Sequence, residues 1–338
     1  MSIIFYSLNG EATWFKIHYF NMEVSCKILR RSVHCFLQNY HYFTSSIAFL
    51  VFPFSVSILL SQAFVPSPSS LLPQIYNRLR MLFDAAGFPS SSLLFNILNL
   101  KVSQTITCSV FSLPFTLTFL LVAKASIIQA LKLNHNKSGL SPSLASIVAL
   151  YKPLFHTYIC NCFLILSANA SSFCLIFLAF NLVETLGYSS PSFLLFMSAT
   201  GAVLFSVILA NALVICNMSL ALSGMEGHGG YSAILKACIL MRGKTSMALF
   251  LALPVNVALA AVEALFHFRV VREYHIVGKA RPFLVLEGIF IAYLYSIFII
   301  LDTTVSCLFY KRLKTESWIV QDKDNYGYIG NKNFEELP

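Results

Sequence analysis

The stretch MALFLALPVNVALAAVEALFHF, residues 247–268, is followed after a short basic linker by FLVLEGIFIAYLYSIFIILDTTVSCLF, residues 283–309. Both stretches reach the roughly 20 residues that an α-helix needs to cross the ~30 Å hydrocarbon core of a bilayer. A helix satisfies its backbone hydrogen bonds internally, so it can span lipid where no water is present. The two stretches therefore predict a pair of transmembrane helices.

Four earlier stretches have the same apolar character, namely residues 46–65, 106–130, 154–180 and 193–215. Apolar residues make up 57% of the 338 positions and charged residues only 11%. A soluble domain carries about 25% charged residues. The sequence thus predicts an all-α integral membrane protein in which six transmembrane helices form one membrane domain, residues 45–310.

Three shorter stretches place apolar and polar residues on opposite sides of a helix, at residues 23–40, 74–86 and 231–241. Amphipathic helices of this kind lie in the interface between lipid and water. The first belongs to an N-terminal segment, residues 1–44, that we expect in the cytoplasm. Residues 311–338 are basic and then polar, which predicts a disordered cytoplasmic tail.

The net charge of +9 comes from the loops and from the two ends of the chain. No Lys/Arg stripe with interleaved aromatic residues lies on a polar domain, so nucleic acid is not an expected partner. Lys and Arg are most frequent in segments that share one side with the N-terminus, which predicts that both termini are cytoplasmic. The expected partners are membrane lipids and other membrane proteins, in an endomembrane or the plasma membrane.

Five stretches resemble a family of uncharacterised plant multi-pass membrane proteins. They are IYNRLRMLFDAAGFP (75–89), LPFTLTFLLVAKAS (113–126), SGMEGHGGYSAILKA (223–237), LPVNVALAAVEALF (253–266) and LEGIFIAYLYSIFIILDT (286–303). The similarity extends from about Val24 to Tyr310, and residues 1–21 look like an extension ahead of a more usual start near Met22. More distantly, the layout is similar to the membrane domain beside some bacterial glycerophosphodiester phosphodiesterases, which is not the catalytic part of those enzymes. The resemblance implies a six-helix fold and no particular chemistry.

Two glutamates lie inside the predicted spans, where an ionised group is costly and normally has a partner or a task. Glu263 and Glu287 fall at similar depths near the outer ends of the fifth and sixth spans, and Asn256 lies two turns before Glu263. One interpretation is a site for a cation or a proton. The other is structural pairing with the adjoining linker, whose candidate partners are His267, Arg269, Arg272 and Arg281.

A third acid, Asp302, lies in the sixth span two turns from its inner end. Lys124 of the second span falls at a matching depth, and a lysine there can also extend to the headgroups. The matching depth motivates the hypothesis of an Asp302–Lys124 ion pair.

Glycines are concentrated around His228 between the fourth and fifth spans, at Gly224, Gly227, Gly229 and Gly230. This concentration of backbone freedom predicts a hinge ahead of the helix at residues 231–241. The alternatives are that His228 is a metal ligand or part of a phosphate-binding turn. A single histidine without Cys, Asp or a second His nearby makes a poor metal site, so we expect no metal, and the phosphate-binding pattern GxxxxGK[ST] is absent from the sequence.

The sequence contains no GxSxG or HExxH motif and no GxxxxGK[ST] loop, so we expect neither an enzyme nor a cofactor. We expect a non-enzymatic protein that organises membranes or binds lipids or partner proteins. The alternative is a transporter or channel for a small solute or cation that uses Glu263 and Glu287.

Overall fold

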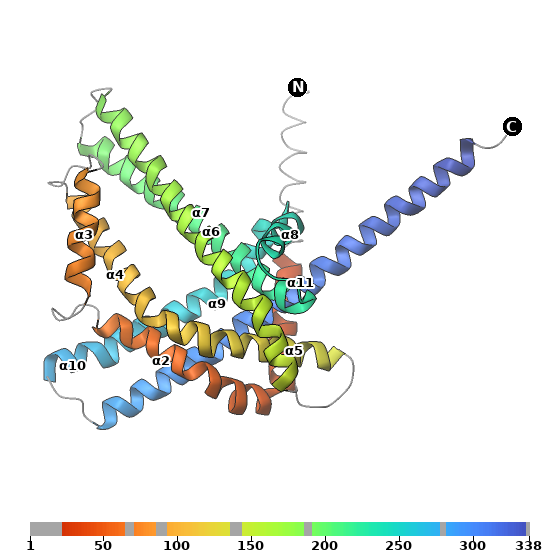
Figure 1. Ribbon diagram of the computed structural model, residues 1–338, viewed down its shortest axis with the longest axis horizontal. Coiled ribbons are helices and arrows are strands. Elements are labelled where there is room, and N and C mark those ends of the chain that lie inside the picture. The colour runs from red at the N-terminus through yellow and green to blue at the C-terminus, as the bar shows by residue number, and fades with distance from the viewer. Residues whose placement is uncertain are drawn as a thin grey trace. The chain divides into compact units, whose positions relative to one another are not determined.

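The computed structural model describes residues 22–64, 71–85, 93–135, 144–185, 191–277 and 282–335, and these ranges contain helices and turns but no strand (Figure 1). Residues 22–38 form the first described helix. The elements after it are η1 (Tyr42–Ile47), α2 (Ala48–Phe64), α3 (Leu72–Ala85), α4 (Leu93–Phe115), η2 (Thr116–Leu120), α5 (Leu121–His135), α6 (Leu144–Thr185), α7 (Pro191–Glu226), α8 (Tyr231–Met241), α9 (Thr245–Phe266), η3 (His267–Val271), α10 (Arg272–Val277) and α11 (Pro282–Glu335).

Six helical stretches in the described ranges are long and apolar enough to cross a membrane, which confirms the predicted number. They are Tyr42–Ser61, Asn99–Lys132, Leu144–Val183, Leu195–Glu226, Thr245–Tyr274 and Pro282–Ser317. Each overlaps one predicted span, and most are longer. The amphipathic stretch at residues 74–86 is helical in its described part, within α3, and the stretch at residues 231–241 is helical as α8.

Pro114 explains an irregular turn in the second of these stretches. Proline has no N–H and its ring collides with the preceding turn, so it disturbs a helix interior. Here α4 ends at Phe115 and the chain continues as the wider π-helical η2, residues 116–120. The Thr118 hydroxyl donates to the Pro114 carbonyl oxygen at 2.7 Å. The widened turn lets the helical stretch continue into α5.

The chain divides into two compact units. The first contains residues 1–38, 128–254 and 302–338, and the second contains residues 39–127 and 255–301.

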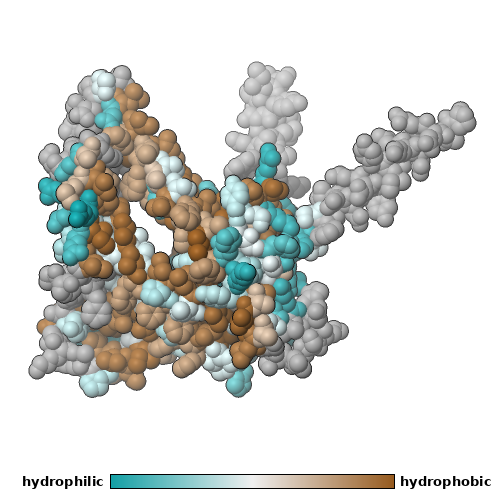
Figure 2. All heavy atoms as spheres, in the orientation of Figure 1, coloured by the Kyte–Doolittle hydropathy of each residue, from teal (hydrophilic) through white to brown (hydrophobic). Residues whose placement is uncertain are grey.

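In the first unit, α6 and α7 pack side by side and α8 packs on both (Figure 1). Asn161 joins the two long helices: its Nδ2 donates to the Cys216 carbonyl oxygen at 3.0 Å, and its Oδ1 accepts from the Ser219 hydroxyl at 2.9 Å. Away from this contact, residues 192–211 of α7 have no buried side chain among those described. The visible face of α6 and α7 is mainly apolar, as expected of helices that face lipid (Figure 2).

In the second unit, α4 packs against α2 and α3. The buried hydroxyls of Ser55 in α2 and Ser296 in α11 lie 2.8 Å apart and share a hydrogen bond. Asn99 Nδ2 of α4 donates to the Tyr76 carbonyl oxygen of α3 at 3.3 Å. The Ser55–Ser296 contact joins two helices that are mainly apolar at this point, a role that small polar side chains often have between helices in lipid.

The predicted disorder after residue 311 is wrong for the residues whose side chains are described there. Helix α11 continues to Glu335, and Leu313 is 1% exposed. Lys311 Nζ donates to the Leu131 carbonyl oxygen at 3.1 Å. The polar composition suggested a solvated tail, but Leu313 packs, and Lys311, Arg312 and Lys314 find acceptors within the first unit.

Candidate functional site

The glycine-rich segment, residues 223–230, contains the end of α7 and the packed turn that leads to α8. Helix α7 ends at Glu226, and Gly227 follows with φ +78° and donates its N–H to the Ser223 carbonyl oxygen at 2.9 Å. A residue with positive φ is a common way to end a helix, and glycine adopts it without strain. Gly224 meets Ile128 of α5, whose Cδ1 lies 2.4 Å from the position that a Cβ would occupy.

The next two glycines bring the turn against α6. A Cβ on Gly229 would lie 2.3 Å from the Pro153 carbonyl oxygen, and one on Gly230 would lie 2.5 Å from His156 Cδ2. The Gly230 N–H donates to Thr157 Oγ1 at 2.8 Å. Close packing thus accounts for these glycines, and the hinge role inferred from the sequence stays a prediction.

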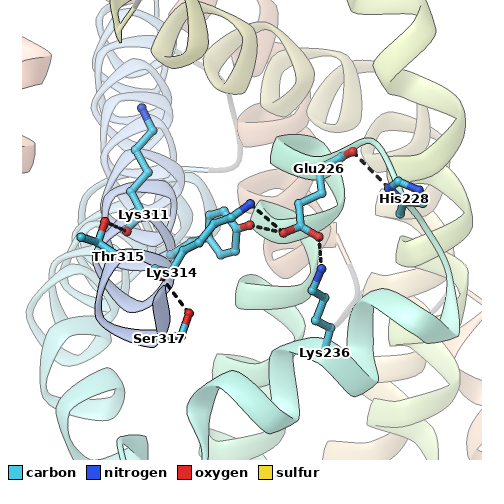
Figure 3. A network of polar contacts seen from close by, with 8 residues as sticks. Glu226, His228, Lys236, Lys311, Lys314, Thr315 and Ser317 are labelled. Atoms are coloured by element: carbon cyan, nitrogen blue, oxygen red, sulfur yellow. Dashed lines mark hydrogen bonds and ion pairs between the residues drawn. The ribbon is translucent and has the colours of Figure 1, made fainter. Parts of the chain in front are cut away.

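Glu226, the last residue of α7, is the centre of a polar cluster that sequence reasoning did not single out (Figure 3). Its Oε1 accepts from the Tyr310 hydroxyl at 2.6 Å and from Lys314 Nζ at 3.0 Å, and its Oε2 accepts from Lys236 Nζ at 2.5 Å. The Lys314 ammonium also lies 5.7 Å from the centroid of the Tyr310 ring. We call these four residues the Glu226 cluster. It holds α7, α8 and α11 together.

A cavity of about 510 Å³ opens beside this cluster. Its polar lining comes from Glu226, His228, Ser232, Lys236 and Lys314. In Figure 3, the side chains of Lys236 and Lys314 extend toward Glu226 from different helices. His228 Nδ1 lies 3.2 Å from the Glu226 carbonyl oxygen, and the Ser232 hydroxyl donates to the Gly229 carbonyl oxygen at 3.2 Å.

Three apolar side chains complete the cavity wall: Leu222, Met225 and Ala233. Leu222 and Ala233 are buried, so this wall belongs to the core of the unit. A cavity of this volume with an apolar wall and a few polar groups has the general form of a small-ligand site.

Another acid, Glu316 of α11, joins α11 to the loop between α8 and α9. Glu316 pairs with Lys244, just ahead of α9, and with Arg312 one turn earlier in α11, whose Nε lies 2.7 Å from Glu316 Oε1. Both cations are more than one-third exposed, so the pairs contribute little to stability and mainly position the side chains.

The two glutamates predicted at one membrane depth have different partners in the second unit. Glu263 Oε1 accepts from the Tyr295 hydroxyl at 2.8 Å. Glu287 Oε1 pairs with Arg269 Nε at 2.7 Å. The second contact is one of the four structural pairings predicted from the sequence. A neutral hydroxyl partner for Glu263 was not foreseen.

The other predicted partners lie on or near the turn after α9. The Arg272 guanidinium lies over the Phe268 ring, 5.2 Å from its centroid. His267 begins η3 and its side chain is exposed. Arg281 lies outside the described residues.

The remaining predicted positions fall in both units. Asn256 of α9 has an exposed side chain in the second unit. Asp302 lines a small cavity of about 30 Å³ in the first unit, together with Asn217 and Ser306. Lys124 belongs to the second unit, so its pairing with Asp302 stays a prediction. In the described part of the chain, no three His, Cys, Asp or Glu side chains gather in a way that would hold a metal ion.

Residues 21–316 match the family described as "Domain of unknown function (DUF8558)". The chain belongs to this family. No curated protein and no solved structure matches the sequence. The DUF8558 match contains every residue of the Glu226 cluster and the Glu263 and Glu287 contacts. The resemblance to plant proteins stays a prediction.

A sequence signal for the Glu226 cluster does exist. Glu226 lies between glycines, directly before an amphipathic helix that carries Lys236. A carboxylate at the C-terminus of a helix is disfavoured by the helix dipole, so a nearby cation stabilises it. Tyr310 and Lys314 are four residues apart and share a helix face. Only the fold brings that face to Glu226.

Proposed function

We propose that this DUF8558 protein is a multi-pass, non-enzymatic protein of an endomembrane or the plasma membrane, with both termini cytoplasmic, that binds and organises lipids at the membrane surface. The observation that carries the proposal is α3. It is amphipathic, yet none of its side chains is buried, and Leu82 is 64% exposed. An apolar face that the fold covers only in part suits the boundary between headgroups and acyl chains.

The other short helices also expose apolar side chains. Leu37 in the first described helix is exposed, and α8 exposes Tyr231, Leu235 and Ile239, the last by 74%. The opposite side of α8 is buried through Ala233, Ile234, Ala237 and Met241. A helix that is apolar on both sides suits a position between a protein core and lipid.

Support for a structural role of the acids comes from their contacts. Arg269 neutralises Glu287, and a carboxylate that is already paired is a weaker candidate for carrying a cation. The rival function, transport through Glu263 and Glu287, predicts cation flux into vesicles reconstituted with the full chain. Such flux, lost in Glu263→Gln or Glu287→Gln, would replace the present proposal.

The substitution Leu82→Glu is expected to release α3 from the bilayer surface. Burying a leucine side chain contributes about 1.5–3 kcal/mol, so the affinity of α3 for the surface falls by at least about tenfold. A helix of 14 residues is marginal in water, and released α3 therefore exchanges its amide hydrogens faster. Hydrogen exchange of residues 72–85 in nanodiscs measures this change.

The matched control is Asn77→Glu, which places the same charge on an exposed polar position of α3. It is expected to leave the exchange rate unchanged. Lipids retained in nanodiscs cut from native membranes are then compared with the bulk membrane. Wild-type discs should differ from the bulk, and Leu82→Glu should reduce the difference. Wild-type discs with the same lipid composition as the bulk membrane would contradict the proposal. Discs that hold partner proteins but no altered lipid composition would contradict it too.

A further inference from the structure

We propose that the cavity beside the Glu226 cluster binds a phosphate group, supplied by the headgroup of an anionic lipid or by a soluble phosphate. The inference rests on the proposed lipid-binding function and names the chemistry that one site would recognise. It begins from the cavity of about 510 Å³, which two lysines from different helices, Lys236 of α8 and Lys314 of α11, line.

The charges at the cavity favour an anion. Two ammonium groups and one carboxylate leave a net charge of +1 from Lys236, Lys314 and Glu226. An ammonium group has three N–H donors, and Glu226 accepts one from each lysine. The other N–H groups can donate to the oxygens of a phosphate in charge-assisted hydrogen bonds, which are stronger than neutral ones.

Glu226 prepares the site instead of blocking it. Lysine side chains are flexible, and fixing them before binding lowers the entropic cost of binding. The Glu226 carboxylate is only 14% exposed and holds both ammonium groups, while Tyr310 anchors the carboxylate and lies against Lys314. The two cations are therefore already close together when an anion arrives.

The apolar wall favours a lipid as the source of the phosphate. Leu222, Met225 and Ala233 give the cavity a hydrophobic side that a free phosphate does not need. A lipid can place its glycerol and the first part of its chains there. With both termini in the cytoplasm, the cluster also lies on the side where anionic lipids gather.

The test uses the full chain in a neutral detergent and a short-chain fluorescent phosphatidic acid, with binding measured by fluorescence anisotropy. Saturable binding is expected for the wild type. Lys236→Gln and Lys314→Gln each lose a charged hydrogen bond and should weaken binding by about tenfold. Lys152→Gln removes an exposed lysine of the same unit that does not line the cavity, and should leave binding unchanged. Lys314→Arg keeps the charge and should retain binding.

Glu226→Gln separates a binding site from a purely structural cluster. It raises the net charge of the cavity by one but releases both lysines from their fixed positions. Binding should therefore weaken less than in either lysine variant. Absence of saturable binding would overturn the proposal. Equal losses in Lys152→Gln, or a loss in Glu226→Gln like that of the lysine variants, would overturn it too.

Competition identifies the source. Displacement by unlabelled phosphatidic acid, but not by inorganic phosphate or phosphatidylcholine, assigns a lipid headgroup. Displacement by inorganic phosphate as well assigns soluble phosphate. If the wild type enriches lipids in nanodiscs but the lysine variants bind phosphatidic acid as the wild type does, this inference fails and the proposed function stands. If the phosphate site is present but no lipid is enriched, the proposed function fails and the phosphate site stands.

Discussion

Replacing Gly229 with alanine is expected to destabilise the first unit by about 3 kcal/mol, at the upper end of what overpacking costs. The added Cβ would lie 2.3 Å from the Pro153 carbonyl oxygen and 2.7 Å from the Pro153 Cα. Both are backbone atoms of α6, which cannot move aside as a side chain can. The turn would have to separate from α6, and the contact between Gly230 and Thr157 would be lost with it.

Gly227→Ala is the matched control. Gly227 has φ +78°, but nothing lies within 4 Å of the position of its Cβ. The substitution therefore carries only the strain of a left-handed backbone, about 1–2 kcal/mol. The two variants are compared by thermal unfolding in detergent, with the fraction of protein that stays monodisperse as the measured quantity. A Gly229→Ala protein as stable as Gly227→Ala would show that the turn does not pack on α6.

Thr157→Val is expected to cost about 2 kcal/mol, because it leaves a buried donor without an acceptor. Thr157 is 0% exposed, and its Oγ1 accepts the Gly230 N–H at 2.8 Å. The same hydroxyl lies 2.9 Å from Ser223 Oγ and 2.8 Å from the Pro153 carbonyl oxygen. Valine has nearly the same shape, so the loss reports the hydrogen bonds and not a cavity.

Thr157→Ser keeps the hydroxyl and removes one methyl group, which costs about 0.8 kcal/mol. The serine variant should therefore be the more stable of the two in the same unfolding assay. Hydrogen exchange at the first residues of α8 gives a local measurement, and it should rise in the valine variant alone. Equal behaviour of both variants would mean that the Gly230 N–H does not depend on Thr157.

The helices could be predicted because apolar runs of sufficient length have few alternatives. The helix predicted at residues 231–241 has the same bounds in the structure. The first span is predicted at residues 46–65 and lies at Tyr42–Ser61 in the structure. The later spans are longer than predicted because helix continues past the apolar core. Helix α7 extends to Glu226, although the fourth span is predicted to end at residue 215.

The site was less predictable because its partners are distant in sequence. Glu287 and Arg269 belong to neighbouring spans, so proximity along the chain suggested their pair. Glu226 and Lys314 are 88 positions apart, and no local pattern predicts that α11 passes α7 at that point. The tail was misjudged for the same reason, since its contacts with Leu131 and Glu226 are long-range.

Glycosylation mapping of the full chain in microsomes tests the six crossings and their orientation most directly. Asn136-Lys-Ser is a native sequon in the second loop, and we expect it to stay unmodified in the cytoplasm. Sequons introduced after residues 68, 188 and 279 should be glycosylated, and those after residue 242 or at the C-terminus should not. A glycan on Asn136, or the same result on both sides of one predicted span, would contradict the account.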